Sequence, residues 1–220
     1  MTKMGATRAV IFDFDYTLAD SSEGIVECIN YALAEMGLAC AERDAACRTI
    51  GLHLNDTFIK LAGQGQAARC DEFRRLFGRR ADEVMTPRTV VYETAPPVLK
   101  ELRERGLKLG IVSTKFRFRI EEILRRDELL DSFDVILGGE DVERHKPHPE
   151  GLYKALERIA CPPASVLYVG DSLADAEVAQ RAAVPFAAVL SGVTPREEFD
   201  GYGAVAVLDD LSQLPRLVGR

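Results

Sequence analysis

Short apolar segments recur along the chain and alternate with helical patterns, and this alternation constrains the fold more than any other feature. Six such segments are rich in β-branched residues and are bounded by Gly, Asp or Ser, as expected for strands buried on both faces. They are AVIF at 9–12, LKLGIV at 107–112, DVIL at 134–137, SVLYV at 165–169, FAAVL at 186–190 and AVAVL at 204–208. The segments between them include VLKELRER, FRIEEILRR and HPEGLYKALERIA, whose apolar residues fall on one helical face. This order predicts an α/β fold with a parallel Rossmann-like sheet and helices on both faces.

The alternation of strands and helices is interrupted once, directly after the first predicted strand. Residues 22–85 show helical periodicity and contain no strand pattern. We therefore predict a Rossmann-like core made of residues 1–20 and 87–220, with a helical cap subdomain inserted at residues 21–86.

Composition and charge exclude several classes of partner. Hydrophobic residues make up 47% of the chain, charged residues make up 29%, and the net charge is −7. An acidic chain of this kind offers no general basic surface for a phosphate backbone, so no nucleic acid partner is expected. The five cysteines include no CxxC pair, which predicts a reducing, cytoplasmic location without disulfides or zinc. Signal-peptide and membrane-span patterns are not found, so no membrane partner is expected, and the sequence does not indicate the oligomeric state.

Two aspartates, Asp13 and Asp15, directly follow the first predicted strand in VIFDFDYTLADS. Side chains two residues apart in an extended segment point the same way, here at the sheet edge where parallel α/β folds bind ligands. Neighbouring carboxylates repel each other unless a cation lies near them, and Mg²⁺ suits hard oxygen ligands. An EF-hand calcium loop is excluded, because Leu18 and Gly24 stand where it needs Gly and Glu. For the D-x-D pattern alone, a solvated acidic turn is an equal alternative.

Three further motifs place chemically useful side chains after other predicted strands. LGIVST ends in Ser113 and Thr114, whose hydroxyls can donate hydrogen bonds to a phosphate. HKPHPEG places Lys146 just before a helix, where its ammonium group can be aimed at an anion. VLYVGDSLAD supplies Asp171 and, four residues later, Asp175. Each motif alone has an ordinary structural explanation, such as a helix cap, but together they supply carboxylates, hydroxyls and a cation around one point.

In order and spacing, the segments DFDYTLADS, IVSTK, HKPHPEG and GDSLAD resemble the four motifs of the haloacid dehalogenase superfamily of phosphatases. The resemblance is to the subgroup with a helical cap after the first motif, and it covers nearly the whole chain. It implies that Asp13 is the nucleophile and Asp15 the general acid/base. It also implies that Ser113 holds the phosphate, a role for which Thr114 is a further candidate, and that Lys146 steadies both the nucleophile and the phosphate.

The same resemblance implies a Mg²⁺ cofactor. Its ligands would be the Asp13 carboxylate, the Asp15 backbone carbonyl and the Asp171 carboxylate, and Asp175 would be a supporting carboxylate or a further ligand. One residue departs from the family pattern, because Tyr16 stands where glycine is usual. If strand alternation continues through this position, the Tyr16 side chain points away from Asp13 and Asp15, and we expect a local change in packing.

By resemblance, the leading function is Mg²⁺-dependent hydrolysis of small phosphate monoesters through an aspartyl-phosphate, as in phosphoglycolate phosphatases. The alternatives are a phosphosugar mutase of the β-phosphoglucomutase type and an inorganic pyrophosphatase. Asp15 argues against a dehalogenase, which lacks an acid/base there. A phosphonatase needs a cap lysine as its nucleophile, and we expect Lys60, the one lysine of the insert, to lie on a solvated face. A non-catalytic binding protein is least favoured, since it would not need the full set of motif residues.

Substrate specificity is expected to lie in the predicted cap, since the four motifs lie outside it. The cap loop RTIGLHLNDTF resembles that of phosphoglycolate phosphatases and pyrophosphatases more closely than the Arg-containing loop of the mutases. Gly51 and His53 are our candidate specificity residues, and His53 either contacts the leaving group or is an exposed loop histidine. The connectors near Asp20 and Thr86 are expected to act as hinges of a mobile lid. The substrate itself is predicted only as a small phosphorylated metabolite.

Overall fold

The computed structural model describes residues 7–218, which fall into two compact units. One unit comprises Met1–Ala19 and Val91–Arg220, and the other comprises Asp20–Val90. The chain passes from one unit to the other in two short paired strands, β2 (Ala19–Asp20) and β3 (Val90–Val91). Across the part of the chain that is described, no helix is both long enough and apolar enough to span a bilayer.

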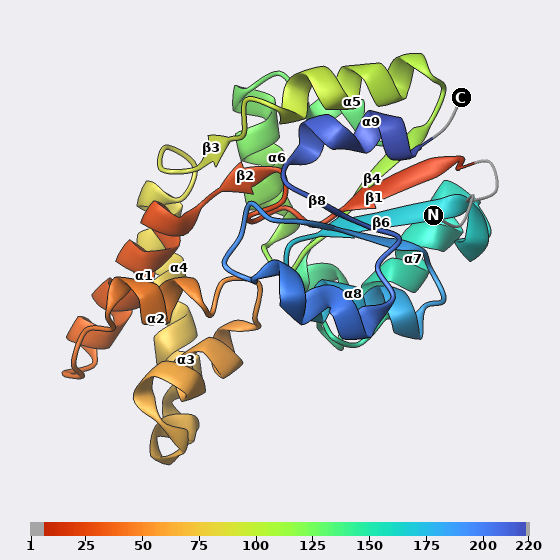
Figure 1. The fold of residues 1–220 in the computed structure, drawn as a ribbon. Helices are drawn as coiled ribbons and strands as arrows, with labels where there is room; N and C mark the ends of the chain where they lie inside the picture. Colours follow the sequence, from red (N-terminus) through yellow and green to blue (C-terminus); the bar gives the residue numbers. More distant parts are fainter. Residues whose placement is uncertain (1–6, 219–220) are drawn as a thin grey trace. The chain divides into compact units, whose positions relative to one another are not determined.

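The larger unit is built on a six-stranded parallel sheet with the strand order β5-β4-β1-β6-β7-β8 (Figure 1). The strands are β1 (Ala9–Phe12), β4 (Lys108–Val112), β5 (Val135–Leu137), β6 (Val166–Gly170), β7 (Phe186–Val189) and β8 (Ala206–Leu208). All six lie where the apolar segments predict them, and the predicted α/β class is confirmed. Strand β1 lies in the centre, where it pairs with β4 on one side and with β6 on the other.

Helices cover both faces of this sheet. Along β1 the side chains alternate: Val10 and Phe12 pack into one hydrophobic core, and Ala9 and Ile11 pack into another. All four are fully buried, which explains why the strand is apolar at every position. The first core is covered by α5 (Ala95–Glu104), α6 (Arg117–Arg126) and α9 (Leu214–Leu217), and the second by α7 (Glu150–Ile159) and α8 (Leu173–Arg181).

The sequence predicts short 3₁₀ helices and the ends of helices less well than it predicts the strands. Helix α5 begins at Ala95, earlier than the apolar pattern from Val98 indicates, because prolines occupy its first turn. Proline is favoured there, where its missing N–H has no helical partner to lose. The larger unit also has 3₁₀ helices at Leu130–Ser132, Gly139–Asp141, Pro163–Ser165, Arg196–Tyr202 and Leu211–Gln213.

The smaller unit, Asp20–Val90, is helical between its terminal strand residues and has a core of its own. Its helices are α1 (Ser22–Glu35), α2 (Arg43–Cys47), α3 (Leu54–Ala62) and α4 (Cys70–Val84), with a 3₁₀ helix at Gln64–Arg69. Phe58 of α3 stacks on Phe73 of α4 with ring centroids 4.7 Å apart, and both rings are fully buried. The helical character that the periodicity of residues 22–85 predicts is therefore present.

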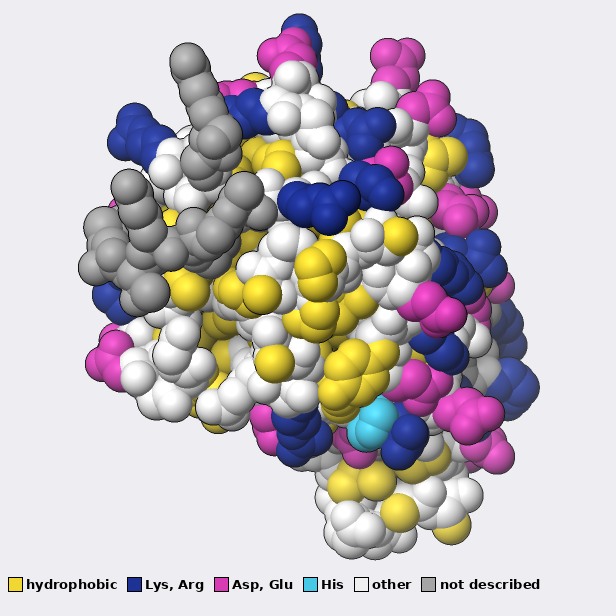
Figure 2. Space-filling model, turned by 90° about the vertical axis from the view of Figure 1, so that its right-hand side faces the viewer, with side chains coloured by type: hydrophobic (Ala, Val, Ile, Leu, Met, Phe, Trp, Pro, Cys, Tyr) yellow, Lys and Arg dark blue, Asp and Glu magenta, His cyan; other side chains and the backbone are white. Residues whose placement is uncertain are grey.

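Surface charges of both signs are mixed. On the face that Figure 2 shows, Lys and Arg side chains are interspersed with Asp and Glu. In the smaller unit, Glu27 of α1 pairs with Arg80 of α4 and with Arg88 beyond it. These partly buried pairs engage basic side chains that a nucleic acid would need.

Three neighbouring strands of the sheet end in polar residues. Ser113 follows β4, Asp13 follows β1 and Asp171 follows β6, and these strands are adjacent in the order β4-β1-β6. In a parallel sheet the carboxyl ends of neighbouring strands meet at one edge, which is where such folds bind ligands. The topology thus gathers residues that are up to 158 positions apart in the printed sequence into one candidate site.

Candidate active site

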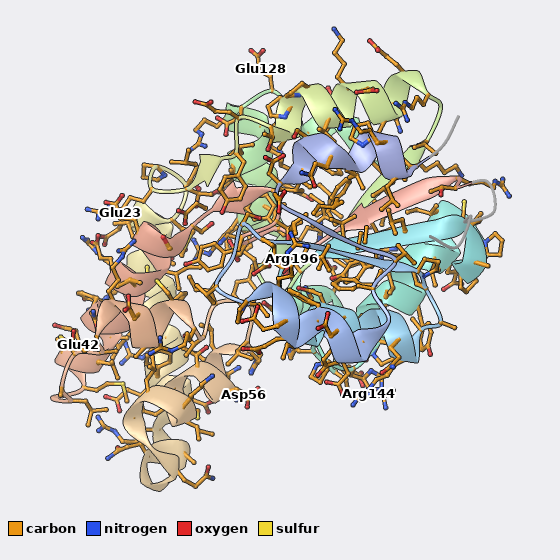
Figure 3. All side chains as sticks on the ribbon, viewed as in Figure 1. Glu23, Glu42, Asp56, Glu128, Arg144 and Arg196 are labelled. Atoms are coloured by element: carbon orange, nitrogen blue, oxygen red, sulfur yellow. The ribbon has the colours of Figure 1, made fainter. Side chains whose placement is uncertain are left out.

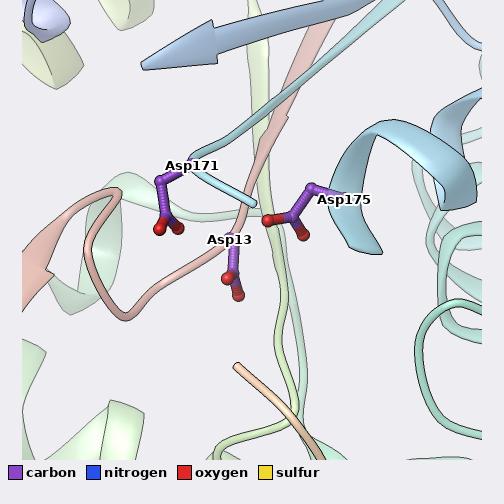
Figure 4. Close-up of side chains that lie close together, drawn as sticks. All are labelled: Asp13, Asp171 and Asp175. Atoms are coloured by element: carbon purple, nitrogen blue, oxygen red, sulfur yellow. The ribbon is translucent and has the colours of Figure 1, made fainter. Parts of the chain in front are cut away.

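Three aspartates form a buried acidic cluster at this edge of the sheet (Figure 4). Asp13 and Asp171 come from the ends of β1 and β6, and Asp175 comes from the first turn of α8. A carboxylate oxygen from each lies within 4.8 Å of the others. The three residues are 2%, 6% and 0% exposed, so water cannot screen their mutual repulsion. The cluster therefore needs positive charge nearby.

Lys146 supplies part of that charge. Its Nζ lies 2.9 Å from Oδ1 of Asp13 and 2.7 Å from Oδ1 of Asp175, and its side chain is 5% exposed. The loop that carries Lys146 also carries Arg144, which is labelled in Figure 3. Glu150 at the start of α7 fixes this loop, because its carboxylate accepts hydrogen bonds from the backbone N–H groups of Glu143 and Arg144. Lys146 is thus held beside the cluster by both charge and backbone contacts.

Asp175 is saturated by hydrogen-bond donors. Its Oδ1 lies within hydrogen-bonding distance of Lys146 Nζ (2.7 Å) and of the Tyr168 hydroxyl (2.9 Å). Its Oδ2 accepts from the backbone N–H and the hydroxyl of Ser172, which completes a capping box at the start of α8. A side chain on Gly170 would place its Cβ 2.5 Å from Cγ of Asp175, so only glycine fits there. These contacts favour a supporting role for Asp175 over that of a metal ligand.

Asp15 lies apart from this group and pairs with a different lysine. Nζ of Lys115 is 2.8 Å from Oδ1 of Asp15, and the two side chains are 5% and 6% exposed. The backbone N–H of Lys115 donates to Oγ of Ser113 at 3.4 Å, while Thr114 between them is half-buried. Lys115 belongs to the motif IVSTK but was assigned no role from the sequence, although it lies two residues after Ser113, a spacing that puts both side chains on one side of an extended chain.

Burial dominates the electrostatics of the cluster. It raises the pKa of Asp13 to about 6; Lys146 opposes this rise, while Asp175 and Asp15 add to it. Burial also raises the pKa of Asp171 well above its usual range, and the charges of Asp175 and Asp13 raise it further. For Lys146, burial alone lowers the pKa, but Asp13 and Asp175 more than offset this and hold the pKa well above its usual value. The negative charge of the cluster exceeds what the lysine neutralises.

A divalent cation fits the donor set. Oδ1 of Asp13 is buried and accepts no hydrogen bond from any residue in 7–218, since Lys146 lies near it outside hydrogen-bonding geometry. Oδ1 of Asp171 accepts one long hydrogen bond, 3.3 Å, from the Thr17 hydroxyl. Among residues 7–218, two lysines form ion pairs within the set of four buried aspartates, Asp13, Asp15, Asp171 and Asp175, so a cation of charge two that takes hard oxygen ligands would complete the site.

Tyr16 lies in a turn and not in the extended strand that the sequence argument assumed. Strand β1 ends at Phe12, and the chain then turns, with the carbonyl of Phe14 accepting from the backbone N–H groups of Leu18 and Ala19. Tyr16 has a φ of 59°, in the left-handed region that glycine adopts most readily. Strand alternation therefore does not set the direction of this side chain. The backbone conformation also explains why glycine is usual at this position.

The loop after β7 completes the wall of the site and carried no motif in the sequence analysis. The Ser191 hydroxyl donates to the carbonyl of Tyr16, and the Tyr92 hydroxyl donates to the carbonyl of Ser191 at 3.3 Å. Gly192 lies against Asp171 so closely that a Cβ would fall 2.0 Å from its Oδ2. A run of Ser and Gly after a strand is so common in loops that its sequence carries no signal for this contact.

The two predicted specificity residues have local structural roles within the smaller unit. Nδ1 of His53 accepts a hydrogen bond of 3.3 Å from the backbone N–H of Asn55, so His53 caps the N-terminus of α3. Gly51 has a φ of 90°, which a residue with a side chain would adopt only with strain. Lys60 is exposed on α3, as expected. A role of Gly51 and His53 in specificity stays a prediction.

Comparison with known proteins identifies the family of the chain. Residues 10–189 match the family model described as haloacid dehalogenase-like hydrolase. This chain belongs to that family. A crystal structure of a haloacid dehalogenase-like hydrolase from Bacteroides fragilis is 43% identical, covers 94% of this chain and 99% of that one, and has a TM-score of 0.92. Pyrophosphatase PpaX of Bacillus mycoides is 34% identical over 213 residues, which are 97% of each chain.

A third similar protein supports the fold alone. It is described as a predicted phosphoglycolate phosphatase from Haemophilus somnus, with 24% identity, a TM-score of 0.86 and coverage of 98% of this chain and 100% of that one. The predictions that this chain is an enzyme and that it is a phosphatase of the haloacid dehalogenase superfamily are confirmed.

Gly192→Ala tests the close approach of the loop to Asp171. The added Cβ must move either the loop or the carboxylate by about 1 Å, and misplacement on that scale costs a catalytic site about 100-fold in rate. We expect kcat/KM for p-nitrophenyl phosphate to fall by about that factor. Gly201→Ala is the matched control, because a Cβ there meets nothing within 4 Å. Equal activity of the two variants would show that the contact has no effect on the site.

Proposed function

We propose that this chain is a Mg²⁺-dependent phosphatase that hydrolyses small phosphate monoesters through a covalent intermediate on Asp13. The observation that carries the proposal is the buried Asp13 carboxylate, which has an oxygen without a hydrogen-bond donor and lies beside both Lys146 and Asp171. A carboxylate that is buried but not neutralised by hydrogen bonds is a competent nucleophile, provided that cations hold its partner phosphate nearby.

The chemistry needs two displacements at phosphorus. In the first, an oxygen of Asp13 bonds to phosphorus as the bond to the ester oxygen breaks, and Asp15 gives a proton to that oxygen. In the second, Asp15 takes a proton from water, whose oxygen bonds to phosphorus and releases Asp13 and inorganic phosphate. Lys146 stays protonated and holds both Asp13 and the charged phosphoryl oxygens in place.

Mg²⁺ would be held by the Asp13 and Asp171 carboxylates and the Asp15 backbone carbonyl. When bound, it would neutralise charge on the transferring phosphoryl group. Two observations support these assignments. The cluster of possible metal ligands contains carboxylates, and the Asp175 carboxylate already accepts hydrogen bonds at both oxygens. All-oxygen donors favour Mg²⁺ over zinc, which prefers nitrogen and sulfur.

The phosphate would be bound at the end of β4. The Ser113 hydroxyl accepts one hydrogen bond, from the Lys115 backbone N–H, so its own proton is available for a phosphate oxygen. Thr114 is half-buried and supplies a second hydroxyl. Together with Lys146, these groups would surround the phosphate with donors, which is how phosphoryl transfer enzymes lower the barrier.

Two substrate classes compete. Small phosphate monoesters such as phosphoglycolate follow from the resemblance of the motifs, while the cap loop resembles those of phosphoglycolate phosphatases and pyrophosphatases alike. Pyrophosphate is the second candidate, because a relative named pyrophosphatase PpaX is 34% identical across 97% of this chain. Ranking phosphoglycolate, pyrophosphate, nucleotides and hexose phosphates by kcat/KM separates the two. Conversion of β-glucose 1-phosphate to the 6-phosphate without phosphate release would instead indicate a mutase.

Asp13→Asn should reduce turnover by several orders of magnitude, because an amide cannot accept the phosphoryl group. Asp15→Asn should cost about 10²- to 10⁴-fold, because both proton transfers lose their catalyst, and it should trap the phosphorylated protein. The measurements are phosphate release and the mass of the intact protein after mixing with substrate. Substantial turnover by pure Asp13→Asn protein would remove Asp13 from the role of nucleophile.

Chelation should abolish activity, and Mg²⁺ should restore it. Binding should also be visible without turnover: at about 100 times its Kd, a ligand of the folded state stabilises it by about 2.7 kcal/mol. We therefore expect Mg²⁺ to raise the Tm of the wild-type protein and to have little effect on Asp171→Ala. Full activity after exhaustive treatment with EDTA would contradict the metal requirement.

Specificity is proposed to lie in the smaller unit, which would act as a lid over the substrate. Because His53 caps α3, His53→Ala also removes a helix cap, which costs about 0.5–2 kcal/mol. His53→Asn is the better variant, since its side chain still caps the helix but lacks the imidazole. We expect His53→Asn to change kcat/KM unequally among natural esters and to leave p-nitrophenyl phosphate turnover nearly unchanged. An equal change for every substrate would exclude His53 as a specificity residue.

A further inference from the structure

A second buried lysine, Lys115, lies beside the proposed acid/base and has no role in the mechanism given above. Its Nζ is 2.8 Å from Oδ1 of Asp15 and 5.7 Å from the ring centroid of Phe14. Phe14 is fully buried, and the Lys115 side chain is 5% exposed. An ammonium group in such surroundings is costly to bury without a partner, so the ion pair with Asp15 fixes both side chains strongly.

The backbone of Lys115 is fixed as well. Its N–H donates to Oγ of Ser113, and its carbonyl accepts a hydrogen bond of 3.0 Å from the N–H of Gly139. Gly139 approaches so closely that a Cβ on it would lie 2.6 Å from the carbonyl oxygen of Thr114. Lys115 therefore joins the Asp15 carboxylate to a rigid part of the loop that would bind phosphate.

We propose that Lys115 is a positioning residue that holds Asp15 for proton transfer to and from the substrate. The proposal rests on the function proposed above, in which Asp15 is the acid/base. Lys115 engages Oδ1, which leaves Oδ2 to give a proton to the leaving oxygen and later to take one from water. Lys115 would act through Asp15 and would not itself exchange protons with the substrate. The loss of kcat/KM on replacing Lys115 should therefore be larger for substrates whose leaving group needs a proton.

Leaving groups of different basicity provide the test. A nitrophenolate leaves without protonation, whereas an alkoxide needs a proton as the bond to phosphorus breaks. We expect Lys115→Met to lower kcat/KM for an alkyl phosphate, such as glycerol 2-phosphate, at least about tenfold more than for p-nitrophenyl phosphate. Lys100→Met is the matched control, because that lysine side chain is 78% exposed on α5, and it should leave both values unchanged.

A double-mutant cycle shows whether Lys115 acts through Asp15. In the Asp15→Asn protein, Lys115→Met should cause almost no further loss with the alkyl phosphate, because the group that it positions is already inactive. Lys115→Arg keeps the positive charge but has a wider donor group, so it should recover part of the kcat/KM for the alkyl phosphate that Lys115→Met loses. If circular dichroism shows that Lys115→Met does not fold, the losses of kcat/KM for the two esters are compared in Lys115→Arg instead.

Several results would overturn the proposal. One is an equal loss for both esters in Lys115→Met, or in Lys115→Arg if the first variant does not fold. Another is a rise in KM at unchanged kcat, which would make Lys115 a substrate-binding group. A third is an undiminished effect of Lys115→Met in the Asp15→Asn protein. If the wild-type protein with Mg²⁺ releases phosphate from neither ester, the proposed function fails first, and this inference fails with it.

Discussion

The ion pairs of Lys146 hold the candidate site together. Its ammonium group lies between Asp13 and Asp175, which would otherwise be buried like charges. Burying an unpaired ion costs several kcal/mol, so the loop that carries Lys146 must be fixed firmly enough to keep it in place. Glu150 does this from the start of α7, and Asp175 is fixed in turn by the capping box of α8. Helix starts, and not only strand ends, therefore determine the geometry of the site.

The sheet explains why the carboxylates are held rigidly although their negative charge is not fully neutralised. Strand β1 lies between β4 and β6 with all four residues buried, so Asp13 projects from a strand that is paired on both edges. A fixed strand end cannot relax to relieve the repulsion between its carboxylates. The site instead keeps surplus negative charge and an oxygen of Asp13 without a donor, as a binding site for a cation and a phosphoryl group requires.

The sequence was informative wherever a pattern is local. The six strands, the buried face of α7 and the motif residues at three strand ends all follow from periodicity and from residue types. Contacts between distant segments could not be read in this way. Only the folded chain brings Lys115 to Asp15 and Gly192 to Asp171. Alternation could not predict the direction of the Tyr16 side chain, because β1 ends at Phe12 and a left-handed residue turns the chain beyond it.

The insertion of one unit within the other has a consequence for the order in which the chain can fold during synthesis. The smaller unit is one continuous segment, Asp20–Val90, whereas the larger unit joins the beginning of the chain to everything after Val91. Chains are made from the N-terminus at about 5–20 residues per second, so the helical segment is complete long before the last strand of the sheet leaves the ribosome. Both edges of strand β1 can be paired only after β4 and then β6 have been synthesised. The helical unit, whose core lies within one continuous segment, is therefore expected to form first and to keep the two ends of that segment close together while the sheet assembles.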